Sequence, residues 1–115
     1  MSLPVRIRKI LIGNPIKDVL NQFRRQLRHS DRYRKKLKRR ISRLPYDREW
    51  RCYSPCPLTP ARLLSIIDAY EHRIQLPPII LREVGSTGFF RIINGRHRLT
   101  LAIALGRRYI RAEFD

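Results

Sequence analysis

The residues best suited to chemistry in this chain stand together at one predicted turn: Gly95, Arg96, His97 and Arg98. The residues before the turn, 89–93, are mostly apolar, and those after it, 99–105, are apolar apart from Thr100, so the pattern predicts a strand, a turn and a buried helix. A helix start leaves backbone N–H groups free, and such groups bind anions. Three cationic or titratable side chains at the same place make this turn a candidate phosphate pocket.

A purely structural interpretation of the same residues is the alternative. Gly95 would then only allow the turn, and His97 would only cap the helix. Arg98 would pair with Glu83 or Asp68. Against this interpretation, neighbouring cations repel one another unless an anion lies among them, so we prefer the phosphate pocket.

The charge of the whole chain indicates a polyanionic partner. The 115 residues carry 26 Lys and Arg against 9 Asp and Glu, a net charge of +17. Such an excess favours nucleic acid as the partner, with an anionic membrane surface second. No apolar run is long enough to cross a bilayer and no secretory signal pattern is seen at the start, so we expect a cytoplasmic protein.

The basic charge is concentrated in the first part of the chain. Residues 1–43 hold 15 Lys and Arg against 2 Asp and Glu, while residues 44–115 hold 11 against 7. We therefore predict two parts, a basic strand-helix-helix segment (1–44) that contacts nucleic acid and a domain (45–115) that contains the phosphate pocket.

Two helices are expected in the basic segment. A short strand and turn, within residues 5–13, come before Asn14-Pro15, which is a typical helix start. Ser30-Asp31 can cap the second helix, whose apolar residues form only a narrow seam that includes Tyr33. The other positions of this helix are nearly all basic, which a solvated face explains poorly. Its predicted nucleic-acid-binding residues are Arg32, Arg34, Lys35, Lys36, Lys38, Arg39 and Arg40.

The second part is predicted to alternate helices and strands. A connector with Trp50, Cys52 and Cys56 leads to a helix that starts at Thr59-Pro60 and ends near residues 72–73. Strands follow at 77–81 and 89–93 as a hairpin, then the apolar helix up to Gly106 and a last strand at 109–114. The two cysteines are too few for a structural zinc site, so no metal site is predicted.

These motifs resemble the ParB/sulfiredoxin family over residues 59–114. The resemblance is carried by Leu-Pro-Pro-Ile (76–79), by Asn-Gly-Arg-His-Arg-Leu (94–99) and by the helix segment 60–68. It implies an α/β (α+β) fold, a small mixed sheet with flanking helices, preceded here by the basic helical segment. Sulfiredoxins carry cysteine where Arg96 stands, so the resemblance implies that reduction of sulfinic acid is absent.

The resemblance also implies a nucleotide ligand. The family's His and Arg contact ATP phosphates, which points to His97 and Arg98, and two further family positions on the preceding helix correspond to Arg62 and Ser65. Ala69 replaces a family hydroxyl. Partition ParB proteins bind CTP at the equivalent turn, so ATP or CTP is the expected nucleotide.

Three functions follow as hypotheses. The first is a small nucleic-acid-binding protein, with DNA ahead of RNA, that has a nucleotide or phosphate pocket at the Gly95 turn. The second is an enzyme of the same fold, a DNase or an ATP-dependent phosphotransferase, that uses Mg²⁺ and Asp68 as its first candidate catalytic carboxylate. The third is an interaction module whose basic helices bind a protein or an anionic membrane.

Overall fold

The computed structural model describes residues 2–26, 31–46, 58–70 and 75–115. Along these ranges the elements come in the following order. They are β1 (Leu3–Arg6), the 3-10 helix η1 (Ile7–Lys9), α1 (Asn14–Gln26), α2 (Asp31–Arg43), α3 (Pro60–Tyr70), β2 (Ile79–Glu83), β3 (Phe90–Asn94), α4 (Arg96–Ala104) and β4 (Tyr109–Phe114). The described part of the chain is thus an α+β fold with four α-helices and a four-stranded mixed sheet.

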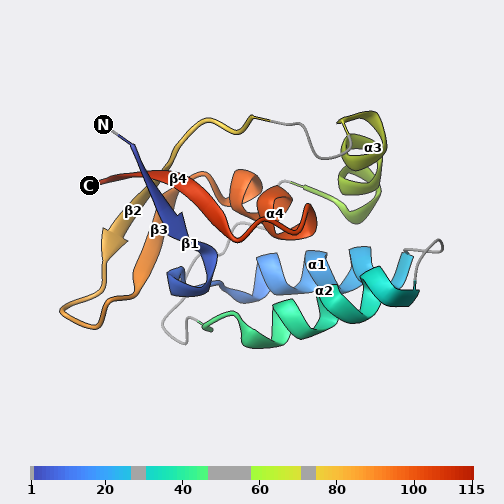
Figure 1. Cartoon of the computed structure of the whole chain (residues 1–115), viewed down its shortest axis with the longest axis horizontal. Helices are drawn as coiled ribbons and strands as arrows, with labels where there is room; N and C mark the ends of the chain where they lie inside the picture. The colour runs from blue at the N-terminus through green and yellow to red at the C-terminus, as the bar shows by residue number, and fades with distance from the viewer. Residues whose placement is uncertain (1, 27–30, 47–57, 71–74) are drawn as a thin grey trace.

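The sheet joins the two ends of the chain. Its strand order is β1-β4-β2-β3, with β1 antiparallel to β4, β4 parallel to β2, and β2 antiparallel to β3. Ala112 of β4 is opposite Leu3 on one side and Ile79 on the other. The first strand of the basic segment therefore completes the sheet of the second part, and both chain ends lie at this sheet (Figure 1).

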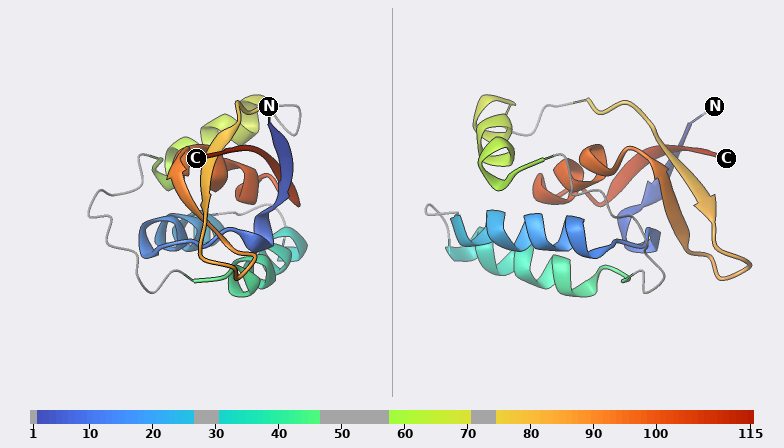
Figure 2. Two further views of the ribbon diagram at one scale, coloured as in Figure 1. Left: turned by 90° about the vertical axis from the view of Figure 1, so that its left-hand side faces the viewer. Right: turned by 180° about the vertical axis from the view of Figure 1, so that it is seen from behind.

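Helix α4 occupies the centre of the fold. Its residues from Leu99 to Ala104 are all buried, as expected for a helix that is apolar on every side. Helix α1 packs against α2, α3 and α4, and α2 runs alongside α1 on the side away from α3 (Figures 1 and 2). Ile16, Leu20 and Phe23 of α1 belong to the same buried cluster as the α4 side chains, so the basic segment and the second part share one core.

Helix α2 is held on the molecule by a narrow apolar seam. Leu37 and Ile41 are buried and Tyr33 is partly buried, at the spacing that a single helix face requires. The remaining basic side chains of α2 are exposed or only partly buried. This helix therefore presents cations to solvent along most of its length.

Most predicted elements are confirmed. α1 begins at Asn14, β2 and β3 form the hairpin, and β4 spans the predicted residues. Gly106 ends α4 with a left-handed φ of 82°, and the amides of Gly106 and Arg107 bond back to the carbonyls of Ile103 and Ala102. This is the Schellman pattern of a glycine-terminated helix.

Two boundaries were wrong. The strand predicted within residues 5–13 lies earlier, as β1 (Leu3–Arg6), while Ile10 and Ile12 make only isolated bridges, to Phe90 and Tyr46. The strand predicted at 77–81 begins only at Ile79, since Pro77 and Pro78 have no N–H to donate to a neighbouring strand. The helix end near residues 72–73, the Ser30 part of the α2 cap and the connector residues Trp50, Cys52 and Cys56 lie outside the described residues.

Candidate nucleic-acid interface and the Gly95 turn

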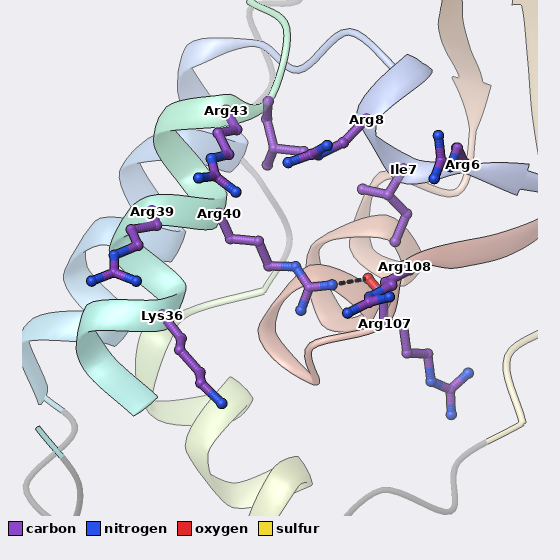
Figure 3. A pocket seen from close by; sticks show the side chains of 10 residues that line it. Arg6, Ile7, Arg8, Lys36, Arg39, Arg40, Arg43, Arg107 and Arg108 are labelled. Carbon is purple, nitrogen blue, oxygen red and sulfur yellow. Dashed lines mark hydrogen bonds between the residues drawn. The ribbon is translucent and has the colours of Figure 1, made fainter. Parts of the chain in front are cut away.

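A basic cleft lies between α2, the β1–η1 segment and the turn from α4 to β4. Its volume is about 460 Å³. Ten residues line it: Arg6, Ile7, Arg8, Lys36, Arg39, Arg40, Arg43, Leu44, Arg107 and Arg108. Eight of these carry a positive charge and none of these described lining residues is acidic. Figure 3 shows these cationic side chains around the cleft, with Arg40 and Arg108 close together at its centre.

Two hydrogen bonds fix one wall of the cleft to the other. The Tyr33 hydroxyl donates to the carbonyl of Ala104, and Nη2 of Arg40 donates to the carbonyl of Arg107 at 2.8 Å. Ala104 is the last residue of α4, where helix carbonyls have no partner within the helix, and Arg107 lies three residues beyond it. Helix α2 therefore supplies donors to the carboxyl end of α4, and this docking forms the cleft.

Gly106 allows this close approach. A Cβ atom at this position would lie 3.0 Å from Nη1 of Arg40. The glycine thus serves two purposes, since it provides the left-handed turn that ends α4 and leaves room for the Arg40 guanidinium. Figure 3 shows Arg40 reaching from α2 to this turn.

The electrostatics of Arg40 reflect its position among other cations. Burial lowers the pKa of the Arg40 guanidinium; the nearby Tyr33 opposes this shift, and the charges of Arg108 and Arg8 add to it. Arginine nevertheless stays charged at any ordinary pH. The carboxyl end of α4 carries a partial negative charge, which favours the nearby cations. The guanidinium groups of Arg40, Arg8 and Arg108 still repel one another, so an anion that enters the cleft is attracted by several of them at once.

The predicted nucleic-acid-binding residues divide into two sets. Lys36, Arg39 and Arg40 line the cleft. Arg32, Lys35 and Lys38 are exposed on α2 outside it, and Arg34 is partly buried. The cleft therefore collects only part of the positive charge of this helix.

The sequence prediction missed the other walls of the cleft. Arg6 and Arg8 come from the β1–η1 segment, and Arg107 and Arg108 follow the α4 stop at Gly106. Arg43 was recognised as basic but not assigned to the site. The Arg-Arg pair directly after a helix-ending glycine is a sequence signal that could have marked these residues, because a turn at a helix end is exposed.

The Gly95 turn has the sharp geometry that the sequence predicted. Gly95 has a φ of 105° and precedes the first residue of α4, and no side chain caps this helix start. A Cβ atom at Gly95 would lie 2.6 Å from Cγ2 of Ile79 and 3.2 Å from Nε of Arg98. The start of α4 is therefore packed directly on the start of β2, which only glycine permits.

The candidate phosphate ligands differ in their contacts and in their exposure. Nη1 of Arg98 donates to the carbonyl of Pro78 at 2.5 Å, so part of this guanidinium is bound to the backbone just before β2. His97 is exposed, and Arg62 and Ser65 are exposed on α3. Burial, and then the charges of Arg98 and Arg62, lower the pKa of His97. The charge of Arg62 thus reaches His97, although the two residues come from separate helices.

Comparison with protein-family models, with curated proteins and with solved structures finds no match to this chain.

Potential metal ligands do not cluster in the part of the chain that the structure describes. Within the described ranges, no group of three or more His, Cys, Asp and Glu side chains could hold a metal ion. Asp68 falls within α3, but its side chain is outside the described part of the structure, so its catalytic role stays a prediction. Among the helices that the structure describes, none is long and apolar enough to cross a membrane.

Proposed function

We propose that this protein binds nucleic acid by holding the phosphate backbone in the basic cleft and along the exposed face of α2. One observation carries the proposal: eight Arg and Lys side chains from separate segments converge on one cleft, and none of its described lining residues is acidic. Guanidinium groups hold phosphate oxygens through paired hydrogen bonds, which makes arginine the preferred residue for this purpose. Seven of the eight cations are arginines.

The proposed interaction reads the backbone rather than the bases. Contacts to phosphates fix position and supply affinity but do not distinguish sequences. The net charge of +17 supports a ligand whose negative charges repeat along its length. DNA is the first ligand to test, with RNA as the comparison.

Binding can be measured by the fluorescence anisotropy of labelled random-sequence DNA and RNA at several salt concentrations. Because each neutralised phosphate releases counterions, the logarithm of the affinity should fall linearly with the logarithm of the salt concentration, with a slope of about −0.9 per phosphate contact on duplex DNA. A slope near zero, or no binding at low salt, would contradict the proposal.

Matched variants separate the cleft from the general charge of the protein. The cleft variant carries three substitutions together: Arg8→Gln, Arg40→Gln and Arg108→Gln. It should bind nucleic acid much more weakly, and its affinity should depend less steeply on salt concentration. The control replaces three cations that do not line the cleft, Lys17, Arg25 and Arg82, and removes the same charge. Equal losses in the two variants would show that only net charge matters. Neutralising Lys35, Lys36, Lys38, Arg39 and Arg40 together tests the contribution of α2.

A second candidate function is nucleotide or phosphate binding at the Gly95 turn. The effect of the Arg62 and Arg98 charges on the pKa of His97 favours it, because it indicates that a cation of α3 and two groups at the start of α4 can act on one anion. The order of hairpin, Gly95 turn, α4 and β4 supports a ParB/sulfiredoxin-like fold for this part of the chain. With that fold, the ligand would be ATP or CTP, and nuclease or phosphotransferase activity with Mg²⁺ would be the enzymatic alternative.

Thermal-shift measurements with ATP, CTP and inorganic phosphate test this second site, since a ligand that binds the folded state raises the melting temperature. The expected shift should fall in His97→Ala and Arg62→Ala but persist in the triple cleft variant. A shift that only the cleft variant abolishes would assign the ligand to the cleft. Nicking of plasmid with and without Mg²⁺, compared between wild type, His97→Ala and Asp68→Asn, tests the enzymatic alternative.

A further inference from the structure

An exposed aromatic ring stands at the rim of the basic cleft. Tyr109 is the first residue of β4 and follows two cleft residues, Arg107 and Arg108. Half of its surface, 50%, remains exposed. In the sheet it is opposite Arg6, which also lines the cleft, and the Arg6 guanidinium lies over the tyrosine ring at 6.0 Å from its centroid. The ring thus lies beside one residue of the cationic wall, Arg6, although Tyr109 does not itself line the cleft.

Core packing does not account for this ring. Along β4 exposed and buried residues alternate at first, with Ile110 and Ala112 buried in the core, and Tyr109 is on the face that points away from it. The cation–π contact with Arg6 is near the outer limit of about 6 Å for such contacts, so it leaves the ring largely available. A flat aromatic surface beside several phosphate-binding groups suits a ligand that offers both a base and a phosphate.

These observations lead us to propose that the cleft receives single-stranded nucleic acid, with a base stacked on Tyr109 and the adjacent phosphates held by the cleft arginines. The inference rests on the proposed nucleic-acid binding and names the form of the ligand. In a duplex the faces of internal bases are already stacked on their neighbours, so Tyr109 would gain little from them. A duplex is also stiff over tens of base pairs, whereas a single strand can bend to place a phosphate near the half-buried Arg40.

Anisotropy titrations with oligo(dT) and with a mixed-sequence duplex of equal length test the inference at one salt concentration. The wild type should bind oligo(dT) more tightly than the duplex. Tyr109→Val, which keeps a good strand residue but removes the ring, should weaken oligo(dT) binding by about 5- to 150-fold, the range of one stacked base. Its affinity for the duplex should stay the same, and Tyr109→Trp should restore oligo(dT) binding.

Tyr46 provides the matched control. It is exposed to a similar extent, 43%, and also has a cation over its ring, Lys17 at 5.7 Å, but this cation, unlike Arg6 over Tyr109, does not line the cleft. Tyr46→Val should leave both affinities unchanged. Equal or tighter duplex binding by the wild type, or equal losses on both ligands in Tyr109→Val, would overturn the inference while leaving nucleic-acid binding intact. Absence of salt-dependent binding to either ligand would instead overturn the proposed function itself.

Discussion

Arg40 and Arg107, 67 residues apart in the chain, are joined by a hydrogen bond from the Arg40 guanidinium to the Arg107 carbonyl. This bond places a half-buried cation beside two others, Arg8 and Arg108, in one cleft. The acceptor is a backbone carbonyl just past the end of α4. It accepts a hydrogen bond from the Arg40 guanidinium but carries no full charge, so the positive charge of Arg40 is not neutralised. The cleft is thus built to keep its positive charge available to a ligand.

Removing one of these neighbouring cations should stabilise the free protein. Arg8→Gln and Arg108→Gln each relieve repulsion with Arg40, and because both side chains are exposed we expect a gain of about 0.5 kcal/mol in the free energy of unfolding at low salt. The gain should vanish at high salt, where exposed charges are screened. Urea unfolding at low and high salt measures it, and the same variants should bind nucleic acid more weakly.

The control for this prediction is Lys17→Gln. Lys17 is an exposed cation that does not line the cleft. Its removal should change stability by less than the two cleft substitutions do. Destabilisation by Arg8→Gln at low salt would indicate that Arg8 makes a favourable contact that outweighs the repulsion.

The hydroxyl of Tyr33 should contribute to the docking of α2. Tyr33→Phe removes the hydrogen bond to the Ala104 carbonyl but retains the ring in the apolar seam. We expect a loss of about 1 kcal/mol in the free energy of unfolding, the usual value for one hydrogen bond. Chemical denaturation would measure this loss, and an unchanged midpoint would argue against the bond. Burial raises the pKa of this hydroxyl, so it stays protonated and able to donate at neutral pH.

Two glycines separate the cost of a strained backbone from the cost of a clash. Gly95 and Gly85 both have positive φ values, 105° and 56°, but only at Gly95 would a Cβ meet other atoms, at 2.6 Å from Ile79. Gly85→Ala should therefore cost about 1 kcal/mol, from the left-handed backbone alone. Gly95→Ala should cost about 3 kcal/mol, because overpacking against Ile79 adds to that strain. Similar losses measured by thermal denaturation would contradict the close approach of α4 and β2.

The protonation of His97 should give a pH dependence to stability. Its pKa is lowered in the folded state, so below the ordinary histidine pKa of about 6.5 the unfolded chain binds the proton more readily. Stability should thus fall as the pH drops through about 6.5 and below, and His97→Gln should reduce this fall. Melting temperatures at several pH values compare the two proteins.

A bound anion at the Gly95 turn should reverse the shift of His97. If phosphate binds beside His97, its negative charge favours the protonated imidazole, and the pKa of His97 should rise in its presence. Proton NMR of the imidazole with and without phosphate measures this change. A pKa that does not respond to phosphate would argue against the anion site at this turn.

The local elements could be predicted because their signals are contained in short stretches of sequence. The apolar spacing in α1 and α2 and the pattern of β4 reflect burial on a repeating face, and the run 99–105 of α4, apolar apart from Thr100, reflects burial on every side. The strand predicted within residues 5–13 lies earlier, at Leu3–Arg6, although the three apolar residues 10–12 also resemble a strand. There the chain crosses between elements, and Ile10 and Ile12 are buried individually rather than paired in a ladder.

The sequence by itself determined which residues are charged, where α1 begins and α4 ends, and that Gly95 and Gly106 mark turns. Only the tertiary structure decided that β1 pairs with β4, and that Arg6, Arg40 and Arg108 meet in one cleft. The physical reason is that periodicity reports only which face of an element is buried. The partner of that face depends on long-range packing, so the cleft and the ring of Tyr109 at its rim could be recognised only in the folded chain.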